Sequence, residues 1–221
     1  MMGYRCVATT IEGFVQQLAV SYVGHGYWFY VTGVVPPGKD ALAIDRKLIL
    51  KYGIDISRSA RVRRKRRGLA NLHYIRFDRF FAIVATHGEH DFFAEERACF
   101  KDARETPIKF GSYAVSYRGG HPHVRIERET CRDLKALFLA DALRPIADLE
   151  STFWRLPFEP YAPVRRQIVT IFKRVNDKRR AAQLEPLSMK CLRLRRKIFR
   201  PFDLEAQAEV RRAEHSRRLF A

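Results

Sequence analysis

The chain has 221 residues, of which 47% are hydrophobic and 12% aromatic, so it can bury a core and is not expected to be disordered throughout. Its 42 lysines and arginines against 24 acidic residues give a formal net charge of +18. Such an excess opposes compaction by self-repulsion and predicts a polyanionic partner. Apolar stretches stay shorter than the roughly 18 residues of a membrane span and no secretory leader is recognisable, so we expect a cytoplasmic protein that does not bind membranes.

In chain order, we expect a helix over residues 11–22, a strand over 27–35, a helix over 40–52, strands over 72–77 and 80–86, a short helix over 92–100 and a strand over 108–117. The order of strand, helix, two strands, helix and strand is that of a ferredoxin-like fold. The predicted fold class is therefore α+β, with an antiparallel sheet that carries helices on one face.

The second part of the sequence is predicted to be mainly helical. A strand over residues 123–128 completes a hairpin, and residues 132–143 form a helix that ends before Pro145. Beyond it, an apolar stripe at helical spacing comprises Val164, Ile168, Ile171, Phe172 and Val175. We expect two domains: a ferredoxin-like nucleic-acid-binding domain over 1–145 and a basic helical lobe over 146–221.

The strongest functional signal is the segment SRSARVRRKRRG at residues 57–68. Its cations are Arg58, Arg61, Arg63, Arg64, Lys65, Arg66 and Arg67. A solvated charged segment normally alternates both signs, whereas no acid occurs here between Asp55 and Asp78. Guanidinium groups donate parallel hydrogen bonds to phosphate oxygens. The segment predicts a flexible or helical arm that grips a nucleic-acid backbone.

Strand 72–77 lies beside this segment and contains alternating aromatic residues. Tyr74 and Arg76 are predicted on the same face, because side chains of a strand alternate. On an exposed face they would form a stacking platform for unpaired bases, as in RNA-binding sheets. In our leading hypothesis RNA is favoured over DNA as the ligand.

Two further groups of cations occur in the predicted helical lobe, and they are candidates for a second nucleic-acid contact. They are Arg165, Arg166, Lys173 and Arg174, followed by Arg193, Arg195, Arg196 and Lys197. If this lobe packs against the sheet, the two basic surfaces form a clamp. The alternative is that they are ordinary solvated helix faces.

His121, Pro122 and His123 place two imidazoles on one side of a strand, an arrangement that can hold a divalent cation. This pattern resembles that of the HUH nucleases, in which such a pair orients Mg²⁺ or Mn²⁺ opposite a tyrosine nucleophile. The resemblance implies Tyr161 as the nucleophile and His87 and His90 as additional ligands. It covers only this motif and the order of elements, and we expect no cofactor outside this nuclease alternative.

A metal-independent alternative is an endoribonuclease similar to those that process CRISPR transcripts, with His25 or His73 in acid–base catalysis. The segments VTGVVPPGKD, RRKRRGLANLHYIRF and LPFEPYAPVRRQ resemble a bacterial family associated with mobile elements, and that resemblance supplies no activity. Our leading hypothesis is an RNA-binding subunit of a ribonucleoprotein or mobile-element complex. The alternatives are a nuclease, and an accessory protein of replication or transposition that binds duplex DNA.

Overall fold

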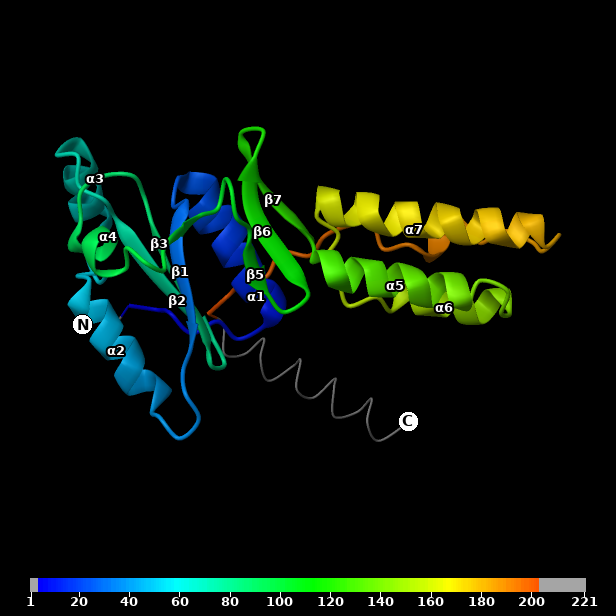
Figure 1. Ribbon diagram of the computed structural model, residues 1–221, viewed down its shortest axis with the longest axis horizontal. Coiled ribbons are helices and arrows are strands. Elements are labelled where there is room, and N and C mark those ends of the chain that lie inside the picture. The colour runs from blue at the N-terminus through cyan, green and yellow to red at the C-terminus, as the bar shows by residue number, and fades with distance from the viewer. Residues whose placement is uncertain (1–3, 203–221) are drawn as a thin grey trace. The chain divides into compact units, whose positions relative to one another are not determined.

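The computed structural model describes residues 4–202 and shows an α+β protein (Figure 1). The described chain falls into two compact units that are not continuous in sequence. The first comprises residues 4–108, 115–122 and 199–202, and the second residues 109–114 and 123–198. The predicted domains, by contrast, were the continuous segments 1–145 and 146–221.

The helices of the first unit are α1 (Ile11–Gln16), its π-helical continuation η1 (Gln17–Tyr22), the short η2 (Val23–His25), α2 (Ala41–Lys51), α3 (Arg58–Arg66) and α4 (Asp91–Glu95). Its sheet contains β1 (Phe29–Val34), β2 (Leu72–Phe77), β3 (Phe80–Ala85) and β4 (Lys101–Asp102) in the order β2-β3-β1-β4. All neighbouring strands pair antiparallel. The ferredoxin-like fold stays a prediction, since β4 has only 2 residues.

Residues 108–117, predicted as the fourth strand of this sheet, do not belong to it. That segment divides at Gly111 into β5 (Ile108–Phe110) and β6 (Tyr113–Arg118). Together with β7 (His121–Ile126) they form a separate sheet in the order β5-β6-β7. Gly111 has a φ of 52°, which favours glycine and reverses the chain between the two short strands.

Helices cover both faces of the four-stranded sheet, whereas the sequence predicted helices on one face only. On one face, Leu72 and Tyr74 pack with Tyr52 and Phe92 in the main hydrophobic cluster. On the opposite face, the ring of Tyr22 stacks on His73 at 4.4 Å between centroids. On that same face, Phe14 of α1 meets the ring of Phe80 edge-on. Strand β2 is consequently buried on both sides.

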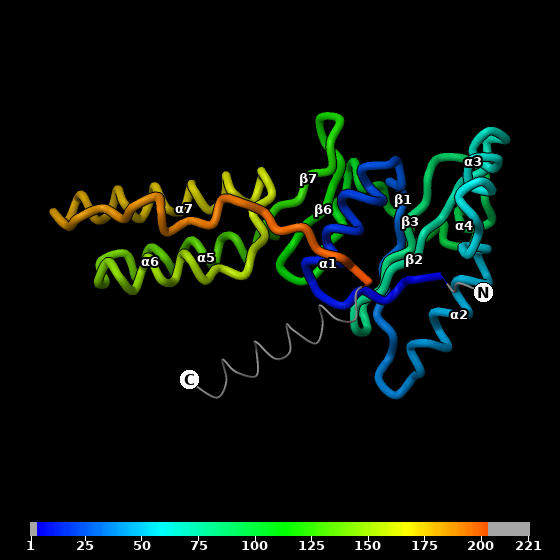
Figure 2. Tube along the Cα trace, turned by 180° about the vertical axis from the view of Figure 1, so that it is seen from behind, coloured from blue at the N-terminus to red at the C-terminus, as the bar shows by residue number. Residues whose placement is uncertain are grey.

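The last described residues return to the first unit. Thr9 donates its backbone N–H to the Pro201 carbonyl at 2.9 Å, and the side chain of Gln16 exchanges two hydrogen bonds with the backbone of Phe199. In Figure 2 this orange segment lies beside the dark blue start of the chain. The two ends of the described chain thus contact each other in the first unit.

The second unit contains α5 (Arg128–Ala140), α6 (Ile146–Trp154), α7 (Ala162–Ala181) and the short η3 (Met189–Cys191). All residues of the predicted apolar stripe on α7 are buried. The stacked rings of Phe138 and Phe153, 4.0 Å apart, join α5 to α6, and Phe172 of α7 meets Phe153 edge-on. The prediction that this part of the chain is mainly helical is confirmed.

Candidate nucleic-acid interface

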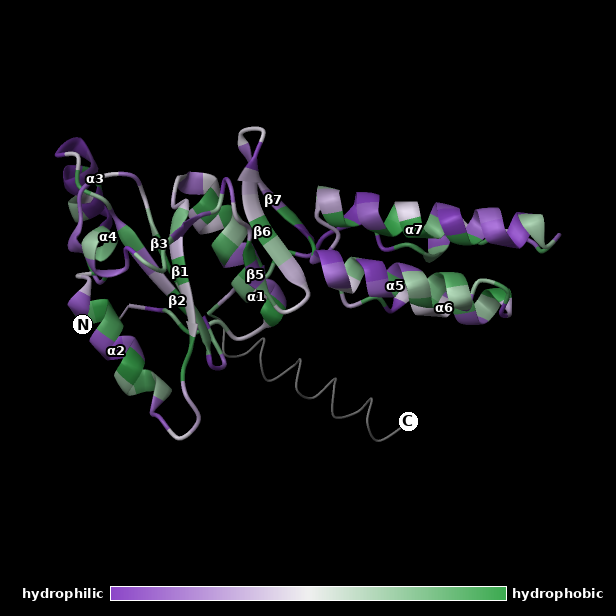
Figure 3. Cartoon of the chain, in the orientation of Figure 1, coloured by the Kyte–Doolittle hydropathy of each residue, from purple (hydrophilic) through white to green (hydrophobic). Residues whose placement is uncertain are grey.

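The arginine-rich segment forms the regular helix α3 rather than a flexible arm. Its first turn is capped by Ser57, whose Oγ accepts a hydrogen bond from the Ala60 N–H at 3.2 Å. Arg67 is the C-cap, and Gly68 follows with a φ of 75°. Most of the cations fall in the last turn, where they lie next to the negative end of the helix dipole. Figure 3 shows α3 as a strongly hydrophilic helix.

Two of the seven cations point into the protein and hold α3 in place. Arg61 donates to the carbonyls of Leu72 and Ile54, both at 2.6 Å. Arg64 donates through Nε and Nη2 to the carbonyl of Ala70 at 3.2 and 3.0 Å. Arg61 and Arg64 are half-buried and hold the helix in place, so they do not belong to the surface that would contact nucleic acid.

The C-terminal end of α3 is anchored by the loop after β3. The Glu89 N–H donates to the Gly68 carbonyl, and the Ala70 N–H donates to the Glu89 carbonyl, each at 3.0 Å. Gly88 makes this close approach possible, because a Cβ at that position would lie 2.5 Å from the Gly68 oxygen. Sequence reasoning missed Gly88, although a glycine between a strand and a helix cap is a detectable signal.

The remaining five cations of the segment, Arg58, Arg63, Lys65, Arg66 and Arg67, are exposed. Ser57, Arg58, Ser59, Val62, Arg63 and Arg66 line an open hollow of about 700 Å³. Within residues 4–202, no ion pair joins any of these five cations to an acidic side chain. The outward face of α3 therefore carries positive charge that the described part of the protein does not neutralise.

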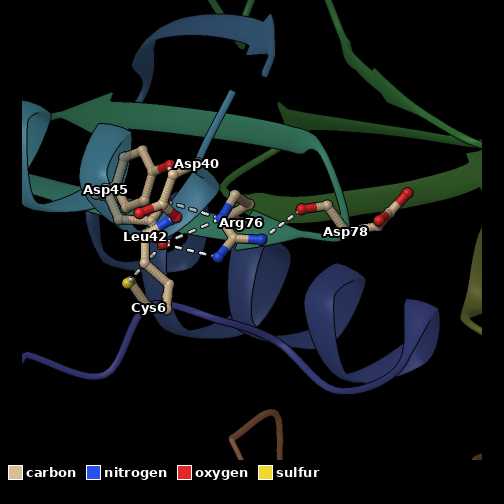
Figure 4. A network of polar contacts seen from close by, with 7 residues as sticks. Cys6, Asp40, Leu42, Asp45, Arg76 and Asp78 are labelled. Carbon is tan, nitrogen blue, oxygen red and sulfur yellow. Dashed lines mark hydrogen bonds and ion pairs between the residues drawn. The ribbon is translucent and has the colours of Figure 1, made fainter. Parts of the chain in front are cut away.

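The predicted stacking platform is wrong. Tyr74 is 0% exposed and Arg76 is 6% exposed, so neither can reach a base or a phosphate. Figure 4 shows Arg76 paired with Asp45 of α2, whose carboxylate also accepts a hydrogen bond from the Tyr74 hydroxyl at 2.5 Å. Arg76 further donates to the backbone oxygen of Asp78. The physical reason is that α2 covers this face of β2 and supplies the buried carboxylate.

His73, a candidate for acid–base catalysis, lies on the opposite face of β2 in an aromatic cluster. Its Nδ1 is 2.9 Å from the hydroxyl of Tyr4, and the rings of Tyr22 and Tyr27 lie against it. Burial, with a smaller contribution from the nearby charge of Arg61, lowers the pKa of His73 to about 3. The imidazole is therefore neutral at physiological pH. The other candidate, His25, is exposed, and its Nδ1 is 3.0 Å from the Val20 carbonyl.

Some cations of the second unit are exposed, and others are at least half-buried and donate hydrogen bonds to backbone carbonyls. Exposed residues are Arg165, Arg166, Lys173, Arg174, Arg195, Arg196 and Lys197. Arg193 is half-buried and donates to the carbonyls of Leu156 and Phe158, with Glu159 3.7 Å away. Arg179, which sequence reasoning missed, is buried and donates to three backbone carbonyls inside the unit. The predicted clamp between the two basic surfaces stays a prediction.

The residues of the nuclease alternative occupy β7 and the start of α7. Strand β7 begins at His121, so strand alternation puts His121 and His123 on one side of it. Tyr161 is the N-cap residue of α7, and the guanidinium of Arg196 lies 4.8 Å from its ring centroid. His90 caps α4, where its Nδ1 accepts from the Phe92 N–H at 3.0 Å. A group of three or more His, Cys, Asp or Glu side chains suited to a metal is not found within residues 4–202.

No protein-family model matches this sequence, and no curated protein matches it either. Among the helices of the described residues, none is both long and apolar enough to cross a membrane.

Proposed function

We propose that this protein binds nucleic acid through the exposed face of α3. The observation that supports the proposal is the set of five outward cations on one anchored helix. Phosphate oxygens would accept hydrogen bonds from these side chains, and the release of condensed counterions from the nucleic acid would supply much of the binding free energy. Arg58, Arg63 and Arg66 also line the open hollow on this face.

Some other exposed cations of the same protein lie next to acidic side chains. Arg144 lies 3.7 Å from both Asp141 and Asp148, and Arg180 lies 3.2 Å from Asp177. At these positions, one in the loop between α5 and α6 and one in α7, the acidic neighbours are three or four residues away. The contrast favours a ligand for α3, because like charges on adjacent turns repel each other unless an anion lies between them.

The predicted stacking platform of Tyr74 and Arg76 would have suited the unpaired bases of RNA. Both side chains are buried, so the platform does not support RNA over DNA, and the preference for RNA stays a prediction. The exposed cations of α7 and of residues 195–197 are a secondary candidate contact, supported by charge and exposure alone.

The proposal is tested by fluorescence anisotropy with labelled DNA and RNA, using two variants that each remove four positive charges. The first is Arg58→Ala, Arg63→Ala, Arg66→Ala and Arg67→Ala. The control is Lys109→Ala, Arg132→Ala, Arg144→Ala and Arg180→Ala, whose cations all have acidic partners. We expect the first variant to lose about a hundredfold or more in affinity and the control to lose much less.

Equal losses in the two variants would show that binding follows net charge and would contradict the proposal. Denaturing gels of the same mixtures, with and without Mn²⁺, address the nuclease alternative at the same time. We expect the nucleic acid to remain intact. Cleavage that His123→Ala abolishes would favour the nuclease instead.

A further inference from the structure

We infer that the ligand of α3 is duplex DNA and that the helix enters its major groove. The inference deepens the proposed function and rests on it. It follows from three properties of the first unit: the rigid presentation of α3, the chemistry of its outward face, and the burial of the surrounding aromatic side chains.

Rigid presentation comes from contacts on the inward side of α3 and at its C-terminal end. Arg61 and Arg64 bind backbone carbonyls behind the helix, and the side chain of Asn71 donates to the carbonyl of Arg61 at 3.0 Å. The loop at Gly88 holds the C-terminal end. The nine residues of α3 therefore meet a ligand as a preformed rod, which suits a groove of fixed width better than a flexible single strand.

The shape of the groove distinguishes the two kinds of duplex. An α-helix with its side chains is about 10–12 Å across, and the major groove of B-form DNA is about 12 Å wide. The major groove of A-form RNA is deep and narrow, so side chains on a helix cannot read its base edges. A rigid helix with an exposed outward face consequently fits duplex DNA and not duplex RNA.

The outward face combines cations with two smaller side chains. Arg58, Val62 and Arg66 are spaced by four residues and form one row, with Ser59 beside it. Val62 is 46% exposed in the middle of this basic face. An aliphatic side chain contributes nothing to phosphate binding, but it can contact the methyl group of thymine. The serine hydroxyl and the arginines can hydrogen-bond to base edges in the major groove.

Single strands are bound differently, mainly by stacking of bases on exposed aromatic rings. Four aromatic residues of the first unit, Tyr27, Tyr52, Tyr74 and Phe92, are buried. Trp28, which is half-buried, already lies beneath the guanidinium of Arg104 at 4.5 Å. Within the described residues of the first unit, no large aromatic side chain is exposed as a stacking platform.

The first experiment is a competition assay with one sequence of about 20 base pairs in four forms: duplex DNA, duplex RNA and the single strands of each. We expect duplex DNA to bind about tenfold or more tightly than the other three. Equal or tighter binding of duplex RNA or of either single strand would overturn the inference and leave the proposed function standing. If none of the four forms binds, the proposed function itself fails.

The second experiment locates the groove by dimethyl sulfate footprinting on duplex DNA. This reagent methylates guanine N7 in the major groove and adenine N3 in the minor groove. We expect protection of guanine N7, removed in Arg58→Ala/Arg66→Ala. Protection confined to adenine N3, or no protection of either atom in a saturated complex, would contradict entry through the major groove. The exposed pair Arg132→Ala/Arg144→Ala is the matched control and should leave the footprint unchanged.

Discussion

Asp45 and Arg76 form an ion pair inside the first unit, with Arg76 Nε 2.8 Å from Asp45 Oδ1 and Arg76 Nη2 2.8 Å from Oδ2. Both side chains are less than a tenth exposed. The Tyr74 hydroxyl donates a hydrogen bond to the same carboxylate. Tyr74 and Arg76, which the sequence predicted as ligand contacts, therefore hold α2 on the sheet.

Asp45→Ala is expected to lower the free energy of unfolding by about 3–5 kcal/mol, because it leaves the positive charge of Arg76 buried without a counter-charge. Urea denaturation measures the change. The control is Asp40→Ala, which removes only the exposed cap of α2 and should cost about 1 kcal/mol. Replacing both partners by apolar residues, Asp45→Leu/Arg76→Met, should recover part of the loss. A double variant as unstable as Asp45→Ala would contradict this interpretation.

Arg61→Ala and Arg64→Ala are expected to act on stability, whereas Arg63→Ala and Arg66→Ala are expected to act on binding. Loss of the Arg61 side chain removes its two hydrogen bonds to the carbonyls of Leu72 and Ile54 and should cost about 1.5–3 kcal/mol. The exposed pair should change the free energy of unfolding by less than about 0.5 kcal/mol. Denaturation and anisotropy on the same four proteins separate the effects. A similar loss of stability in all four would contradict the division of α3 into an inward and an outward side.

His73 is expected to make the protein less stable as the pH falls. Its pKa is lowered in the folded state to about 3, so the unfolded chain binds the proton more readily below its own pKa of about 6.5. Stability should fall by up to about 1.4 kcal/mol per pH unit between pH 6.5 and pH 3. Partial burial also lowers the pKa of His90, with the same sign.

The measurement is the midpoint of urea denaturation at about pH 7 and at about pH 5. Both values lie above the range in which Glu127 titrates, because Lys109 lowers the pKa of Glu127 to about 2. His73→Gln should reduce the difference between the two midpoints. His87→Gln, at an exposed position, should leave it nearly unchanged. An undiminished difference in His73→Gln would show that the imidazole is not held neutral by the fold.

Gly88→Ala is expected to lower the free energy of unfolding by about 2 kcal/mol or more, because the new methyl group meets backbone atoms of residues 68–70. Gly38→Ala is the matched control. Gly38 also has a positive φ, but no atom lies within 4 Å of its added Cβ, so only about 1 kcal/mol of backbone strain is expected. Equal costs in the two variants would mean that the loop at Gly88 does not clamp α3.

The sequence was informative where the pattern of one segment decides its structure. The β-rich runs at 72–77 and 80–86 predicted β2 and β3, and helical spacing predicted α2 and α7. The cations at 58–67 marked the candidate surface. These features depend on local propensity and periodicity, which can be read from neighbouring residues.

The predictions from the sequence were wrong where contacts between segments far apart in the chain determine the structure. The alternating residues of β2 are typical of a strand with one solvent-exposed face. In the structure, α1 and η1 cover one side of β2, and α2 and α4 cover the other. The carboxylate of Asp45 that pairs with Arg76 belongs to α2, far from β2 in the sequence. Nor does any local signal tell Arg61 from Arg63. The carbonyls that turn Arg61 inward belong to Ile54 and Leu72, and only the folded chain brings them together.

The salt dependence of binding tests the central claim most directly. If the five outward cations of α3 contact phosphates, a plot of log affinity against log salt concentration for duplex DNA should have a slope of about −4 to −5. Arg58→Ala/Arg63→Ala/Arg66→Ala/Arg67→Ala should reduce the slope to about −1, while Lys109→Ala/Arg132→Ala/Arg144→Ala/Arg180→Ala should keep it. The same slope in the α3 variant as in the unmodified protein would contradict the claim that α3 is the interface.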